Sequence, residues 1–341
     1  MRLIICGNGF DLHHHLATSY SSYKEYLEKN HRRDFKAYES LAKLGGCKDC
    51  WSDIEAALAR VNFHTIIEKT TRNSVVQKIH EYEQGNSDEL STFAMQMAMA
   101  TGFVSNFTGK YFFDWLSNVD VSTVNRDKGL RFSKDDIFVT FNYTDTLEEL
   151  YGVPERRILH IHGSLSDINE DTAYSDILEA YDDSFLGFDD NQHDHDQLDD
   201  YQLDNEFSFS IHEAIRFGGI IDVDNRIESL ERAYITDETS EAFFRPILDL
   251  IRNYYRRSAK EIEDKKEELR VFLRPYAKNS IDTVRIMGHS LVSVDDSYYE
   301  DVIVPLTQNA KWEFMVHGKD RSEIDQFIDK YGLSDTVLIN W

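Results

Sequence analysis

The sequence RLIICGNGFDLHHHL, residues 2–16, predicts the fold of this chain. The apolar run 3–6 is typical of a short buried strand, and the segment after Gly9 has helical character. Between them, Gly7 and Gly9 allow a sharp turn that brings backbone N–H groups close to an anion. A complete dinucleotide fingerprint has a third glycine where this chain has Leu12, so the turn alone is a weak indication of a nucleotide site.

The rest of the chain alternates between short β-rich runs and long helical blocks. We expect strands at residues 3–6, 137–141, 158–161, 284–287, 312–316 and 337–339. Apolar positions at helical spacing predict a large helical insertion over 17–130 and a second helical block over 222–280, broken at Pro246. The chain is therefore predicted to be a single elaborated α/β domain, 1–341. Its Rossmann-like parallel sheet has helices on both faces and the large insertion after its first strand.

Composition excludes several classes of protein. The chain has 341 residues, of which 41% are hydrophobic and 13% aromatic, which excludes a disordered protein. It lacks an apolar run of about 18 residues, so we expect no membrane-spanning helix. The N-terminus lacks the pattern of a signal peptide, and 3 cysteines are too few for a disulfide framework. We therefore expect a cytoplasmic protein.

The net charge of −25 is concentrated in one segment. Between Arg157 and Arg216 there is no lysine or arginine, whereas residues 167–213 hold 16 Asp and Glu. We expect an acidic, solvated or mobile insertion over 166–212. His193 and His195 within it suggest a cation site, but the segment has no periodic scaffold to fix ligands, so we expect no metal. The acidic balance argues against a nucleic-acid partner.

Four groups of candidate site residues follow predicted strands. Since the carboxyl ends of parallel strands meet at one edge of a sheet, we expect them to line one binding crevice. The groups are Gly7, Asn8, Gly9, Phe10 and Asp11 with His14; Asn142 and Tyr143; His162 and Gly163; and Gly288, His289 and Ser290 with Asp295. Each also has a structural interpretation, such as a tight turn for the glycines or a helix cap for Asp11.

Three of these residues have side chains that suit acid–base chemistry. The imidazole of His162, whose ordinary pKa is near neutrality, suits a general base, although a satisfied core histidine is the competing interpretation. Asn142 would orient water or a hydroxyl group, and the carboxylate of Asp11 would stabilise developing positive charge. Alternation along a strand places His160 on the same face as His162, one pleat inward, where packing is its expected role.

These motifs together resemble a known family, the AbiH-type bacteriophage abortive-infection proteins. The resemblance spans residues 3 to about 305 in matching order and rests on GNGFDLxH (7–14), TSY (18–20), WSDIE (51–55), FNYT (141–144), IHGS (161–164) and GHSL (288–291) with Asp295. The skeleton resembles, more remotely, the sirtuin-like NAD-binding fold of bacterial anti-phage NAD hydrolases. That resemblance implies that Gly7 and Gly9 meet the pyrophosphate, Asn142 and Tyr143 line the nicotinamide-ribose site, His162 before Gly163 is catalytic, and Gly288 with Ser290 binds the adenosine half.

The chain departs from the sirtuin deacetylases, which carry four zinc cysteines after their His-Gly pair. Here Cys47 and Cys50 form one isolated pair upstream, so neither a zinc site nor deacetylation is implied. The resulting hypothesis is an anti-phage protein that binds NAD or a related nucleotide and hydrolyses its nicotinamide–ribose bond. The alternatives are a non-catalytic nucleotide-binding sensor or partner-recruiting protein and, more weakly, a metal-dependent nuclease. A phage-derived trigger, a co-encoded defence protein and a homo-oligomer are all compatible with the sequence.

Overall fold

The computed structural model of the protein describes residues 1–44, 50–51, 54–71, 75–85, 93, 97–98, 101–102, 104, 107, 109–127, 129–165, 222–258, 262–276, 281–291, 295–316 and 321–341. The acidic insertion predicted over 166–212 lies outside the described residues, as does Cys47.

A parallel sheet organises the part of the chain that carries the candidate site. Its strands are β1 (Arg2–Cys6), β2 (Ile137–Thr140), β3 (Ile158–His160), β4 (Thr283–Met287), β5 (Lys311–Val316) and β6 (Thr336–Asn340). All neighbours pair in parallel, in the order β3-β2-β1-β4-β5-β6. The six predicted strands are therefore confirmed, each within one residue at either end. This strand order is that of the doubly wound dinucleotide-binding fold.

The position of β1 at the centre of the sheet decides where a ligand site is expected. Ile4 pairs with Phe138 of β2 on one side and with Arg285 of β4 on the other. From Leu3 to Cys6 the strand is completely buried, which explains its continuous apolar sequence. The strand order reverses between β1 and β4, so the carboxyl ends of these two strands mark the switch point of the sheet.

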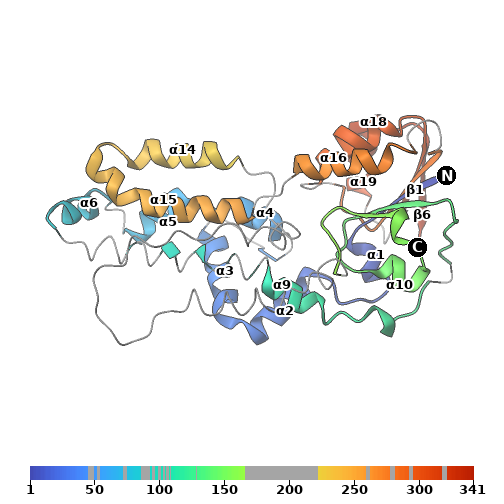
Figure 1. Cartoon of the computed structure of the whole chain (residues 1–341), viewed down its shortest axis with the longest axis horizontal. Helices are drawn as coiled ribbons and strands as arrows, with labels where there is room; N and C mark the ends of the chain where they lie inside the picture. Colours follow the sequence, from blue (N-terminus) through green and yellow to red (C-terminus); the bar gives the residue numbers. More distant parts are fainter. Residues whose placement is uncertain are drawn as a thin grey trace.

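Helices cover both faces of the sheet, as the sequence predicted (Figure 1). One face packs against α16 (Ile262–Leu273), α17 (Asp296–Tyr298), the π-helical turn η3 (Tyr299–Ile303), α18 (Val304–Leu306) and α19 (Ser322–Tyr331). The other face packs against two short helices that follow β1 and β2, namely α1 (Asn8–His13) and α10 (Thr146–Tyr151). The turn η2 (Glu155–Arg157) leads into β3.

The remaining helices form a separate helical part beside the sheet (Figure 1). Between β1 and β2 the structure places α2 (Tyr20–Asn30), α3 (Arg32–Leu44), α4 (Ile54–Ala59), α5 (Phe63–Thr70), α6 (Val75–Glu83), α9 (Lys110–Leu116) and the turn η1 (Val121–Thr123). Between β3 and β4 it places α14 (Val223–Tyr234) and α15 (Glu238–Ser258). In the described part of the chain, none of the helices is both long and apolar enough to cross a membrane.

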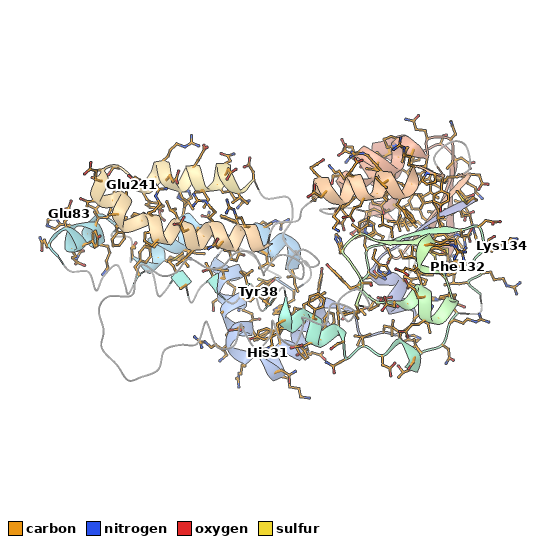
Figure 2. All side chains as sticks on the ribbon, in the orientation of Figure 1. His31, Tyr38, Glu83, Phe132, Lys134 and Glu241 are labelled. Carbon is orange, nitrogen blue, oxygen red and sulfur yellow. The ribbon has the colours of Figure 1, made fainter. Side chains whose placement is uncertain are left out.

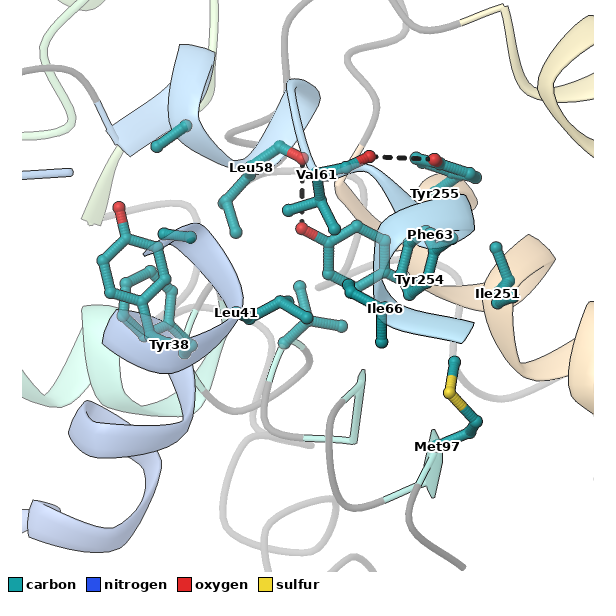
Figure 3. Packing of buried hydrophobic residues seen from close by; sticks show 14 of the residues in the cluster. Tyr38, Leu41, Leu58, Val61, Phe63, Ile66, Met97, Ile251, Tyr254 and Tyr255 are labelled. Atoms are coloured by element: carbon teal, nitrogen blue, oxygen red, sulfur yellow. Dashed lines mark hydrogen bonds between the residues drawn. The ribbon is translucent and has the colours of Figure 1, made fainter. Parts of the chain in front are cut away.

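One aromatic-rich core joins the two helical segments, although they are far apart in sequence. The Tyr254 hydroxyl of α15 donates to the Leu58 carbonyl at 3.0 Å, and that of Tyr255 donates to the Val61 carbonyl at 3.2 Å (Figure 3). Tyr38 is buried in this core, whereas Phe132 packs in the part that contains the sheet (Figure 2). The insertion and the second block therefore share one hydrophobic interior.

The expected break at Pro246 is wrong. Helix α15 continues from Glu238 to Ser258 with Pro246 inside it. Pro246 itself is exposed, while Phe243, Phe244 and Ile247 beside it are fully buried in the helical core. Burial of this apolar face keeps the helix continuous in spite of the N–H that proline lacks.

Candidate functional site at the carboxyl edge of the sheet

The turns after β1 and β4 lie directly against each other at the switch point. The Gly9 N–H donates to the Gly288 carbonyl at 2.8 Å, and the Gly7 N–H donates to the Met287 carbonyl at 3.1 Å. A Cβ on Gly9 would lie 2.6 Å from the Gly288 Cα, and Gly288 has a φ of +65°. The glycines are therefore required where backbone passes against backbone. The N–H groups of Gly7 and Gly9, which the sequence pattern predicts to lie close to an anion, already donate to the Met287 and Gly288 carbonyls.

A carboxylate between two imidazoles forms the centre of the candidate site. His162 Nε2 lies 3.8 Å from Asp295 Oδ1, and His289 Nε2 lies 3.5 Å from Asp295 Oδ2. The other ring nitrogen of His289, Nδ1, hydrogen-bonds the Tyr299 hydroxyl at 2.9 Å. All three ionisable side chains are largely buried. The structure thus brings together three residues that the sequence placed after two different strands.

Aromatic rings at the end of β2 fix the two histidines. The Phe141 ring centroid lies 4.0 Å from that of His289 and 5.7 Å from that of His162. Tyr143 stacks with His162 at 5.9 Å and contacts Phe112 of α9 edge to face at 5.2 Å. Tyr143 therefore links the histidine pair to the core of the helical part.

Asn142 connects the end of β2 to the glycine turn of β1. Its Nδ2 donates to the Gly7 carbonyl at 3.1 Å, and its backbone N–H donates to Thr140 Oγ1 at 3.1 Å. The side chain is buried, and Oδ1 has no hydrogen-bond partner among the described residues. Because buried polar atoms are normally satisfied, this oxygen is a ready acceptor for a ligand N–H or O–H.

Asp11 is a buried carboxylate held by hydroxyl groups. Thr144 Oγ1 donates to Asp11 Oδ2 at 2.6 Å, and Thr146 Oγ1 donates to Oδ1 at 2.9 Å. Asp11 is only 1% exposed. Burial raises the pKa of Asp11 to about 6, although hydrogen bonds from Thr144, Thr146 and Asn142 oppose the rise. Asp11 is therefore held against the segment between β2 and α10, behind Asn142.

Several predicted ligand residues make contacts that are sufficient to explain them structurally. His14 Nδ1 donates to the Phe10 carbonyl at 2.7 Å and Nε2 accepts from the Tyr151 hydroxyl at 2.6 Å, and burial lowers the pKa of His14. Phe10 packs in the core between α1 and α10. Asn8 accepts from Thr18 Oγ1 at 2.6 Å. A role in ligand binding for Asn8, Phe10 and His14 stays a prediction.

Two other predicted residues lie in the turns at this edge. Ser290 is exposed and follows His289 directly. Gly163 has a φ of +80°, which permits the turn after His162. Whether either of them contacts a ligand also stays a prediction.

The expected common face of His160 and His162 is wrong, because β3 ends at His160 and the chain then turns. His160 Nδ1 donates to the Asn142 carbonyl at 3.1 Å, and Nε2 lies 3.0 Å from Glu148 Oε1. Burial opposes the charge on His160, but the hydrogen bond and charge of Glu148 raise its pKa overall. His160, at the end of β3, thus pairs with Glu148 of α10, and of these two histidines only His162 lies beside Asp295.

Sequence reasoning missed two groups of residues around the site. Tyr299, which contacts His289, carries no sequence signal that separates it from other core tyrosines. The second group is Asp145, Glu148 and His160, whose ligand-type atoms lie within 4.8 Å of one another. The spacing of Asp145 and Glu148 by three residues at a helix start was available, but it did not reveal that β3 brings His160 beside them.

A family model described as bacteriophage abortive infection AbiH matches residues 3–316, which include all of β2 to β5 and all of β1 except Arg2. No curated protein and no solved structure matches the chain significantly.

Proposed function

The chain belongs to the AbiH family of bacteriophage abortive-infection proteins and serves in defence against phage, and on that premise we propose that it binds NAD or a related nucleotide and hydrolyses the nicotinamide–ribose bond. The strand order supports this proposal, since doubly wound sheets of this order bind nucleotides at the switch point. Four segments with polar or glycine-rich sequence converge there, from the ends of β1, β2, β3 and β4.

The observation that carries the proposal is the placement of Asp295 beside His162. A carboxylate 3.8 Å from Nε2 places a negative charge beside the imidazole. That charge stabilises the imidazolium that forms when His162 takes a proton. His162 is therefore a titratable side chain that lies beside a carboxylate and is largely buried.

The proposed reaction is displacement of nicotinamide by water. As the C1′–N1 bond breaks, its electron pair stays on nicotinamide, while an oxygen of water forms the new bond to C1′ and its proton passes to His162. Asn142 Oδ1, a buried acceptor without a partner among the described residues, would bind a ribose hydroxyl and hold the sugar in place. The Asp11 carboxylate, behind Asn142, would favour the positive charge that develops on the ribose.

The proposal is tested by measuring nicotinamide release from NAD by the purified full-length chain, and NAD content in phage-infected cells that express it. We expect His162→Ala to abolish the reaction. Asp295→Asn should lower kcat with little effect on KM, because the amide cannot stabilise the imidazolium. His80→Ala on α6 is the matched control, since His80 is an exposed histidine of the helical part, and it should behave as wild type.

Two results would count against hydrolysis. If infected cells keep their NAD and His162→Ala protects them as well as wild type does, the proposed reaction is wrong. If calorimetry shows binding of NAD or ADP-ribose that depends on Asn142 while no nicotinamide is released, the site belongs to a sensor that does not turn over its ligand.

A further inference from the structure

We propose that Asp145, Glu148 and His160 bind one divalent transition-metal ion, such as Zn²⁺, on the α10 side of the sheet. This site is separate from the His162–Asp295–His289 group. It depends neither on the proposed hydrolysis nor on NAD.

The donor atoms lie close to, but not yet at, the spacing that a metal ion requires. One atom from each of the three side chains lies within 4.8 Å of the others, and His160 Nε2 is 3.0 Å from Glu148 Oε1. Tetrahedral ligands about 2.0–2.2 Å from a common Zn²⁺ are about 3.3–3.6 Å apart, so the three side chains would close in on the ion by up to about 1.5 Å. Asp145 precedes α10 and Glu148 lies in its first turn, while His160 ends the neighbouring strand β3.

The histidine is oriented as metal-binding histidines are. His160 Nδ1 donates its proton to the Asn142 carbonyl at 3.1 Å, which fixes the ring and directs Nε2 toward the two carboxylates. A backbone carbonyl or carboxylate on the second nitrogen is the usual partner of a histidine that ligates a metal. Binding of the ion would displace the proton that Nε2 now shares with Glu148, releasing H⁺ to solvent.

Glu148 supplies an observation independent of the spacing. Its Oε2 is inaccessible to solvent and has no hydrogen-bond partner among the described residues, although the other oxygen pairs with His160. A buried carboxylate oxygen without a donor is costly unless a ligand satisfies it. An ion held between the three side chains would provide that partner.

The local charge also favours a cation. Asp145 at the N-cap of α10 and Glu148 and Glu149 in its first turn place three acidic side chains at this end of the helix. One imidazole nitrogen with two carboxylates suits Zn²⁺ or Mn²⁺ better than Mg²⁺ or Ca²⁺, which prefer oxygen ligands alone.

The test is calorimetric titration of ZnCl₂ into the metal-stripped full-length chain, in two buffers of different ionisation enthalpy. We expect Glu148→Gln to weaken one Zn²⁺ equivalent by at least about 10-fold, the loss expected for an altered metal site. His160→Gln should remove the same equivalent together with its proton release. Glu149→Gln is the matched control, because it makes the same charge change one residue away and should change the affinity by less than about threefold.

Asp145→Asn provides a second variant should Glu148→Gln fail to fold, and circular dichroism of each protein without metal checks folding. The proposal is overturned if the wild-type chain binds no Zn²⁺. It is also overturned if Glu148→Gln, Asp145→Asn and Glu149→Gln all bind Zn²⁺ equally. Displacement of the ion by equimolar Mg²⁺ would overturn the assignment to a transition metal.

Discussion

Replacing Gly288 by alanine tests whether the contact between the two glycine turns holds the switch point together. Gly288 combines two constraints, a φ of +65° and a position where a new Cβ would overlap the Gly9 carbonyl carbon and the Phe10 amide nitrogen. Gly332, which ends α19, has nearly the same φ of +61°, but nothing lies within 4 Å of its Cβ position. Gly332→Ala therefore isolates the cost of the backbone conformation.

The two costs can be separated in magnitude. The left-handed conformation costs about 1–2 kcal/mol for a residue with a Cβ, so this is the expected loss for Gly332→Ala. Overpacking adds about 1–3 kcal/mol, so Gly288→Ala should lose about 2–5 kcal/mol. Gly9→Ala, whose Cβ would lie 2.6 Å from the Gly288 Cα, should lose about 1–3 kcal/mol by overlap.

Urea unfolding followed by tryptophan fluorescence and circular dichroism measures these differences in the free energy of unfolding. The decisive comparison is between the two glycines with positive φ. Equal losses for Gly288→Ala and Gly332→Ala would contradict the prediction, because the contact with Gly9 would then contribute nothing. A Gly9→Ala protein as stable as wild type would also show that the contact between Gly9 and Gly288 contributes nothing.

Three further predictions concern stability. The folded-state pKa of Asp11, about 6, lies above its ordinary value of 3.8, so this group favours the folded state at low pH, and its contribution of about 3 kcal/mol is lost as the pH rises from 4 through 6. The free energy of unfolding of Asp11→Asn should therefore rise by about that much relative to wild type between pH 4 and pH 8. A difference between the two proteins that does not change with pH would contradict the assignment. Tyr151→Phe removes the donor to His14 and the acceptor of the Asp127 N–H, and should destabilise the chain by about 1–3 kcal/mol in urea unfolding. An unchanged free energy of unfolding would show that these two hydrogen bonds do not stabilise the chain. Pro246→Ala supplies the N–H missing from α15 at an exposed position and should stabilise the chain by about 1–3 kcal/mol; a lowered Tm would show that proline is preferred there.

The strands and their common edge could be predicted because a buried parallel strand reads as a short apolar run. Residues 3–6 are such a run, and residues 284–287 are apolar except for Arg285; parallel pairing then requires their carboxyl ends to lie at one edge. The sequence pattern predicts that Gly7 and Gly9 leave space for an anion. The sequence could not show that Gly9 and Gly288 make this space for each other, because the contact forms only after β4 pairs with β1.

The individual histidines were harder to predict, since their roles depend on residues distant in sequence. His14 is satisfied by Tyr151, and His162 faces Asp295, and neither pairing follows from local spacing. His160 differed from expectation because a strand one residue shorter turns the following side chain away. Pro246 differed because tertiary packing of an apolar face overrides a local helix breaker.

The central position of β1 has a consequence for synthesis of the chain. Arg2 pairs with Thr283, so β1 reaches this second neighbour only after about 280 further residues have been translated. At about 5–20 residues per second, about 280 residues take on the order of 14–56 s, during which the apolar residues 3–6 lack that edge partner. Nascent chains therefore expose an unpaired apolar strand edge for that period, and ribosome-associated chaperones are expected to contact β1 until β4 emerges.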